Sequence, residues 1–103
     1  MHQDSRTDPV TLDPDKFKIR MENERIRVLE ASIPSGEGHG MHWHPEHLIY
    51  TLSSYKVRDT FPDGTTKTMA RGAGQLLWGE ELTHATQNVG ETAVHALIIE
   101  LKD

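Results

Sequence analysis

The sequence predicts an all-β domain closed into a barrel or jelly roll, and three observations favour this fold. From residue 17 onward, short runs of β-branched and aliphatic side chains are separated by the turn residues Gly, Pro, Asn, Asp and Ser. No segment has the long apolar stripe of an amphipathic helix. The chain has 103 residues and no cysteine, so we expect one compact core without disulfides.

Nine segments have the length and composition of strands. They are residues 17–21, 25–33, 41–43, 48–52, 56–61, 65–70, 75–78, 84–88 and 93–101. The clearest connection is Pro62, Asp63 and Gly64, because an Asp-Gly pair supplies the positive φ angles that a tight hairpin needs. Such a series of short strands with regular turns fits closure into a barrel.

The first residues differ from the rest of the chain. Residues 1–16 are polar, contain Pro9 and Pro14, and lack the periodicity of a helix or a strand. We therefore expect residues 1–16 to form an arm that is flexible or ordered by a partner, and residues 17–103 to form the barrel. A small barrel with an acidic surface can bury its edge strands against a symmetry mate, so we expect a homodimer.

Charge and hydropathy exclude two classes of partner. The formal net charge is -5, and the eleven Lys and Arg are dispersed along the chain, which argues against nucleic-acid binding. No apolar run is long enough to span a bilayer, and the first residues lack the order of a secretory signal. We therefore expect a cytoplasmic protein that binds no membrane.

Histidine is the unusual component of the composition. The chain has seven histidines, and four of them lie between residues 39 and 47. In a strand, side chains at i and i+2 share a face, so His42 and His44 are expected to point together, and His47 and His84 could complete a metal site. An isolated His-x-His is common and often structural, so the prediction depends on all four side chains.

The region around these histidines resembles the first conserved motif of the cupin family, which is a glycine, five residues and then His-x-His. Residues 36–44 read Gly-Glu-Gly-His-Gly-Met-His-Trp-His. In cupins a glutamate follows after three or four intervening residues, with a glycine seven positions after it. Here His47 follows His44 after two intervening residues, and Ser54 stands at the position of the glycine. The resemblance implies that His47 takes the place of the glutamate.

The second cupin motif also has a counterpart. In cupins it is a glycine, a proline-glycine turn and a histidine, with an asparagine after three more residues. Gly74, His84 and Asn88 match it, with one residue fewer and without the proline. The resemblance implies a double-stranded β-helix with metal ligands His42, His44, His47 and His84. It extends to small bacterial cupins with a His-x-His-Pro sequence and a closing Ile-Glu-Leu-Lys, some of them associated with β-alanine degradation.

The replacement of the glutamate would leave four neutral ligands. A divalent ion then keeps more of its positive charge and is a stronger Lewis acid, and the preference of Mn²⁺ for oxygen ligands is not met. We therefore favour iron, nickel or zinc. The nearest general base is lost as well. Glu80 and Glu81 precede His84 and could reach the barrel mouth, although such a pair is more often solvated. No catalytic residue is assigned.

These features favour a metal-dependent enzyme that acts on a small polar metabolite inside the barrel, of the oxygenase, hydrolase or isomerase type, with a dioxygenase-like reaction as one form. The alternative is a non-enzymatic module that binds a small ligand or senses a metal. Turnover of a metabolite by the metal-loaded protein would favour the enzyme, whereas stabilisation by a ligand without turnover would favour the module.

Overall fold

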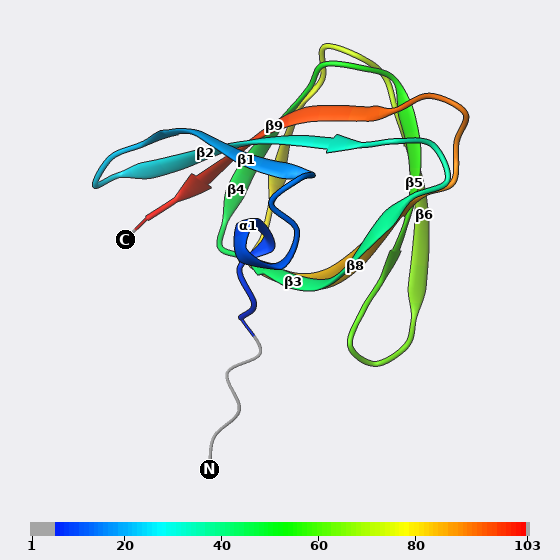
Figure 1. Cartoon of the computed structure of the whole chain (residues 1–103), viewed down its shortest axis with the longest axis horizontal. Helices are drawn as coiled ribbons and strands as arrows, with labels where there is room; N and C mark the ends of the chain where they lie inside the picture. The colour runs from blue at the N-terminus through cyan, green and yellow to red at the C-terminus, as the bar shows by residue number, and fades with distance from the viewer. Residues whose placement is uncertain (1–5, 103) are drawn as a thin grey trace.

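The computed structural model describes residues 6–102 and contains one short helix followed by nine strands in this range (Figure 1). The elements are α1 (Pro9–Leu12), β1 (Phe17–Glu22), β2 (Ile26–Ile33), β3 (Gly38–His44), β4 (His47–Thr51), β5 (Tyr55–Thr60), β6 (Thr66–Arg71), β7 (Leu76–Gly79), β8 (Leu82–Asn88) and β9 (Val94–Leu101). All nine predicted strands are present. The largest boundary difference is in β3, which begins at residue 38 instead of 41.

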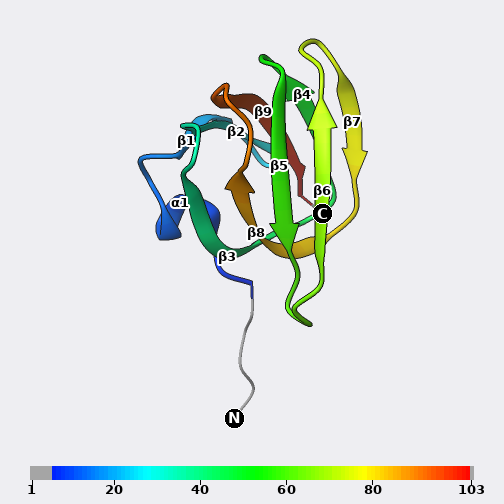
Figure 2. The ribbon, with the colours of Figure 1, turned by 90° about the vertical axis from the view of Figure 1, so that its right-hand side faces the viewer.

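The strands form two antiparallel sheets that face each other as a jelly-roll barrel (Figures 1 and 2). The first sheet has the order β1-β2-β9-β4-β7, and the second has the order β3-β8-β5-β6. Most neighbours in these sheets are distant in the sequence, as in the pairs β2 with β9 and β3 with β8. The predicted all-β barrel is therefore confirmed.

Alternation of side chains along the strands separates the barrel interior from its surface. In β9 every second residue, from Val94 to Glu100, is buried, and the intervening residues are partly exposed. Buried apolar side chains form two clusters on the inner faces. One cluster consists of Phe17, Leu29, Ala31 and Ile98, and the other consists of Ile33, Val57 and Val94. Burial of these side chains is the main favourable contribution to folding.

The predicted hairpin joins β5 to β6, but one detail of its turn differs from the expectation. Gly64 has a φ of 88°, whereas no residue other than glycine has a positive φ among the described residues. Asp63 instead accepts hydrogen bonds from the backbone N and the Oγ1 of Thr65, at 3.0 and 2.7 Å. The loop is therefore a three-residue connection with one left-handed glycine, and the aspartate acts through its side chain.

The described part of the N-terminal segment lies against the barrel, below β2 and beside β3 in Figure 1. Asp8 caps α1 by accepting a hydrogen bond from the backbone N of Val10 at 2.9 Å, and Val10 packs on the first apolar cluster. The backbone N of Trp43 donates to the carbonyl oxygen of Thr7 at 2.8 Å. Residues 1–5 of the predicted arm lie outside the described residues, and the division at residue 16 stays a prediction.

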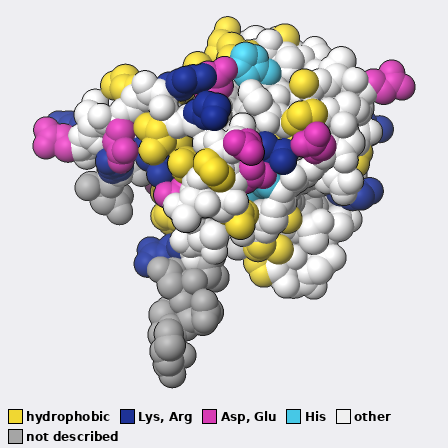
Figure 3. Space-filling model, in the orientation of Figure 1, with side chains coloured by type: hydrophobic (Ala, Val, Ile, Leu, Met, Phe, Trp, Pro, Cys, Tyr) yellow, Lys and Arg dark blue, Asp and Glu magenta, His cyan; other side chains and the backbone are white. Residues whose placement is uncertain are grey.

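Two surface features bear on partners. On the face that Figure 3 presents, basic and acidic side chains are interspersed with apolar ones and do not form a stripe of one sign. No helix within residues 6–102 is long and apolar enough to cross a membrane. The expected absence of nucleic-acid and membrane partners and the cytoplasmic location stay predictions.

Candidate metal site in the barrel

Three of the four predicted ligands meet inside the barrel. His42 and His44 are two residues apart in β3 and therefore share its inner face, while His84 in β8 is the direct cross-strand partner of His42. One ring nitrogen from each histidine lies within 4.8 Å of the others. His42 and His44 are buried, and His84 is partly buried. Three imidazoles that converge from two paired strands could hold a divalent transition ion.

His42 provides the test of whether an ion fits. Its side chain is fully buried, and Nδ1 lies 2.9 Å from the carbonyl oxygen of Gly40, to which it can donate. Nε2 is buried and has no hydrogen-bond partner among residues 6–102. Burial lowers the pKa of His42 to about 2, so the ring is neutral at pH 7. A buried nitrogen lone pair without a partner costs free energy, and a metal ion among the three histidines would satisfy it.

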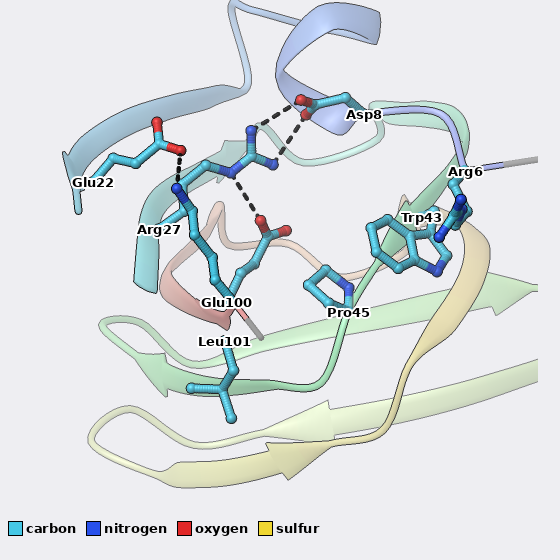
Figure 4. Close-up of a pocket in the computed structure, with 9 residues that line it drawn as sticks. Arg6, Asp8, Glu22, Arg27, Trp43, Pro45, Glu100 and Leu101 are labelled. Atoms are coloured by element: carbon cyan, nitrogen blue, oxygen red, sulfur yellow. Dashed lines mark hydrogen bonds and ion pairs between the residues drawn. The ribbon is translucent and has the colours of Figure 1, made fainter. Parts of the chain in front are cut away.

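His44 is oriented by a chain of charged groups that reaches the N-terminal segment. Figure 4 shows the members of this chain beyond His44, which are Glu100, Arg27 and Asp8. Nδ1 of His44 lies 2.8 Å from one carboxylate oxygen of Glu100, and Nε of Arg27 donates to the other at 2.8 Å. Both terminal nitrogens of Arg27 donate to Asp8, at 2.9 and 3.1 Å. A carboxylate that accepts the Nδ1 proton leaves Nε2 as the ligand atom and fixes the plane of the ring.

The charges in this chain explain the direction of each pKa shift. Burial acts to raise the pKa of Glu100, but the hydrogen bonds from His44 and Arg27 outweigh it and hold the pKa below its usual range. Burial also lowers the pKa of His44, against the effect of Glu100. The pair at neutral pH is therefore a neutral imidazole that donates to a carboxylate, which is the protonation state that metal binding requires.

His84 lies beside a second buried carboxylate. Its Nδ1 is 3.0 Å from Oδ2 of Asp59, but the atoms are not aligned for a hydrogen bond, so Nδ1 has no hydrogen-bond partner. The other oxygen of Asp59 accepts a hydrogen bond from Oγ1 of Thr86 at 2.9 Å. Asp59 comes from β5, so the second sheet places a carboxylate behind His84 much as the first sheet places Glu100 behind His44.

His47 lies next to this group but is not one of the three residues whose atoms lie within 4.8 Å. It begins β4 on the opposite sheet, and its ring centroid is 5.2 Å from that of His44. Nδ1 lies 2.7 Å from the carbonyl oxygen of Pro45. Nε2 lies against Gly79, where a Cβ atom would overlap the imidazole ring. His47 as a fourth ligand therefore stays a prediction.

The histidines open onto a cavity of about 270 Å³ in the barrel. The first and second apolar clusters form part of its wall, together with side chains from β5, β6 and β7. This volume is close to the lower end of the range for small-molecule sites, which is roughly 300–1,000 Å³. The cavity is thus large enough for a small metabolite beside an ion.

No family model matches the sequence, and no curated protein matches it. Solved structures do match. A cupin domain from Bordetella pertussis Tohama I has a TM-score of 0.77 at 24% identity, over 84% of this chain and 92% of that one. An RmlC-like cupin family protein with a double-stranded β-helix fold from Methanocaldococcus jannaschii has a TM-score of 0.66 at 11% identity, over 84% of this chain and 78% of that one. This chain has the cupin fold.

A third similar structure is an enzyme. A mutant of oxalate decarboxylase from Bacillus subtilis has a TM-score of 0.60 at 24% identity, over 78% of this chain but only 22% of that one. At these identities the similarity establishes the cupin fold alone, so the chemistry has to be argued from the site itself.

Two further histidines and the glutamates Glu80 and Glu81 lie at the edge of the site or outside it. His39 lies beside the three converging histidines, with its ring centroid 4.4 Å from that of His42. His95 is on the outer face of β9, where it pairs with Glu30. Glu80 and Glu81 accept hydrogen bonds from the indoles of Trp78 and Trp43, at 2.7 and 2.9 Å. The two glutamates thus bind indole groups on the surface of the cupin barrel.

Sequence analysis missed the two carboxylates behind the histidines. The alternation of buried and exposed residues along the strands could have indicated both carboxylates. In β9, Glu100 follows Val94, Ala96 and Ile98 at every second position, and in β5, Asp59 follows Val57 in the same way. A carboxylate in register with buried apolar residues must face the interior, where it requires a partner.

Proposed function

We propose that this cupin binds a divalent transition ion through His42, His44 and His84, with His47 as an additional ligand, and is a metal-dependent enzyme for a small polar metabolite. The observation that carries the proposal is the group of three imidazoles around the unpartnered Nε2 of His42. An ion held by three or four imidazoles has positions left for water or substrate, and it would supply Lewis-acid or redox chemistry there.

The residues of the chain would orient these ligands and control access. Glu100 holds the ring of His44, and the carbonyl oxygen of Gly40 holds that of His42. The apolar wall of the cavity limits the water that can reach the ion. Because the three converging ligands are neutral, iron, nickel and zinc suit the site best. An oxygenase, hydrolase or isomerase reaction fits this arrangement, and the association with β-alanine degradation stays a prediction.

The decisive experiment measures bound metal. Elemental analysis of tag-free protein should find a transition ion in the wild type, and His42→Ala should lose it because one of three ligands is removed. His95→Ala is the matched control, since this histidine lies on the outer face and pairs with Glu30. Equal metal content in the wild type and His42→Ala would refute the assigned ligands. Conversion of a metabolite by metal-loaded protein then separates the enzyme from a binding or sensing module.

A homodimer forms the second part of the proposal, and an apolar outer face supports it. Two rows of side chains cross β7, β4 and β9 on the outside of the first sheet. They are Trp78, Leu48 and Ile99 in one row and Leu76, Tyr50 and Leu97 in the other. Leu76 and Trp78 are 65% and 52% exposed. β7 is an edge strand, so antiparallel pairing with its own copy about a twofold axis would bring the rows of two molecules together.

The side chains of this face do not oppose a second copy as the partner. Two molecules with a formal net charge of -5 repel each other at long range, and the six side chains of the two rows carry no charge. Contact through the rows therefore places no charged side chain of one row against another.

A further inference from the structure

We propose that the ligand of this cavity is a small organic anion with two carboxylates, one at the ion and one at the far end, and that the far carboxylate is recognised by Lys67 in a short ligand or by Arg71 in a longer one. This inference rests on the proposed metal site and names the substrate class for it. It depends on three features of the cavity. Two cations line it, they have no carboxylate partner among the described residues, and a bound ion would add further positive charge.

Lys67 and Arg71 share the cavity with the histidines. Both belong to β6, and with Met69 between them they occupy alternate positions that line the cavity. Lys67 is the cross-strand partner of Asp59, and Arg71 is the partner of Tyr55. The intervening residues of β6 are absent from the lining, as expected for the outward face of a strand.

Neither cation has a carboxylate partner in the part of the chain that the structure describes. Within residues 6–102, no carboxylate lies within 4.0 Å of the ammonium group of Lys67 or of the guanidinium group of Arg71. Arg71 donates to Sδ of Met69 at 3.2 Å, which is a weak acceptor. By contrast, Arg27 near the other side of the site makes charged hydrogen bonds with both Asp8 and Glu100. Arg71 therefore keeps most of its planar fork of donors for a ligand.

The balance of charge among the residues that line the cavity favours an anion. Asp59 is the only carboxylate among the described lining residues, and it already accepts from Thr86 and lies against His84. A divalent ion on neutral imidazoles would add two positive charges to those of Lys67 and Arg71. Excess positive charge in a partly closed apolar cavity is stabilised by a ligand of opposite sign. Most other lining side chains are apolar, which fits a compact carbon skeleton between the two polar ends.

The positions of the two cations imply that the length of the ligand decides which of them it contacts. They are four residues apart on β6, which corresponds to roughly 13 Å along a strand. Lys67 is level with Asp59, which is next to His84, whereas Arg71 is level with Tyr55 farther along the barrel. A short dianion that reaches the ion should therefore use Lys67, and a longer one should use Arg71.

The test is calorimetric titration of metal-loaded protein with malonate, succinate and adipate, with acetate and succinamide as the single-carboxylate and uncharged probes. We expect at least one dicarboxylate to bind about tenfold more tightly than acetate, and succinamide not to bind. Lys67→Gln or Arg71→Gln should lower the affinity for that dicarboxylate by about tenfold and leave the affinity for acetate nearly unchanged. Arg58→Gln is the matched control, because it removes the same charge from the outward face of β5.

The outcomes separate this inference from the proposed function. Bound metal and the thermal unfolding midpoint are measured for every variant, so that loss of affinity is compared only among folded, loaded proteins. Metal binding without preference for any dicarboxylate, or equal affinities in the wild type and both variants, would overturn the anion assignment and leave the metal site intact. Failure of the wild type to bind metal would overturn both.

Discussion

At the scale of single residues, Glu100 connects the histidines to the rest of the barrel. Its two carboxylate oxygens contact His44 and Arg27, and its side chain is almost fully buried. A buried carboxylate is stable only when both oxygens have such partners. Through Arg27 and Asp8, the orientation of His44 depends on the first described residues of the chain.

Glu100→Gln should therefore weaken metal binding without unfolding the protein. The amide has nearly the same shape but a poorer acceptor for Nδ1 of His44, and loss of such a partner typically lowers metal affinity by about 10–100-fold. Competition with a coloured chelator measures the dissociation constant. Glu30→Gln is the control, because Glu30 pairs with His95 on the outer face. An unchanged constant in Glu100→Gln would show that His44 does not need this carboxylate.

One buried and one partly buried histidine also predict how stability depends on pH. Burial lowers the pKa of His42 to about 2 and that of His39 to about 4, from an ordinary value of 6.5. Below pH 6.5 the unfolded chain takes up protons that the folded protein does not, so the free energy of unfolding falls as pH falls. For His42 the loss approaches about 1.4 kcal/mol per pH unit and continues toward pH 2, whereas His39 contributes down to about pH 4.

Urea unfolding of chelator-treated protein between pH 7.5 and 5.5 measures this slope. The lowered pKa of Glu100 changes the free energy of unfolding mainly below pH 5.5, because the ordinary pKa of a glutamate is 4.5. His39→Asn should retain part of the slope, since His42 still stays neutral when folded. A free energy of unfolding that is constant over this range would contradict the burial of neutral histidines.

At the scale of elements, the pairing of β4 with β7 places His47. His47 is the cross-strand partner of Gly79, and its imidazole occupies the space that a side chain at residue 79 would fill. Residue 79 does not have a positive φ, so its backbone conformation does not require glycine. Glycine is needed there because a larger side chain would overlap the imidazole of His47. A histidine at the start of one strand and a glycine at the end of its neighbour act as one unit.

Gly79→Ala should therefore destabilise the protein by about 1–3 kcal/mol, because the added methyl group displaces a buried ring. Gly72→Ala is the control, since the nearest atom to its Cβ would be 3.9 Å away in Gln75. Thermal unfolding gives the change in stability, and metal titration shows whether moving His47 changes affinity. A metal affinity equal to the wild type in a folded Gly79→Ala variant would count against His47 as a ligand.

At the scale of the whole molecule, the first sheet has an outer face that a monomer leaves exposed. Leu76, Trp78 and Tyr50 are 65%, 52% and 40% exposed and adjoin across β7 and β4. Contiguous exposed apolar surface of this kind commonly marks an interface. The proposed homodimer would cover this face and pair the open edge of β7.

Leu76→Lys should convert the proposed dimer into a monomer, because two copies would place like charges next to each other at a twofold interface. Size-exclusion chromatography with light scattering measures the mass. Met41→Lys is the control, since Met41 is 38% exposed on β3 of the other sheet. A wild type that is monomeric at all concentrations tested would refute the homodimer.

Much of this architecture could be predicted from the sequence. Local composition marked all nine strands, because β-branched runs and turn residues act over a few positions. The spacing of His42 and His44 placed both on one face, since alternation is a property of the strand itself. The glycine and histidine spacings resembled cupins closely enough to indicate the barrel, which the solved structures confirmed at the level of fold.

Tertiary structure alone decided which groups meet. Glu100 reaches His44 across 56 positions and Arg27 across 73, and no local pattern specifies such pairs. Barrel closure likewise placed Lys67 and Arg71 in the cavity of the histidines and positioned His47 beside the three converging rings instead of among them. The physical reason is that the sequence fixes the face on which a side chain lies, whereas strand register and closure fix what lies opposite.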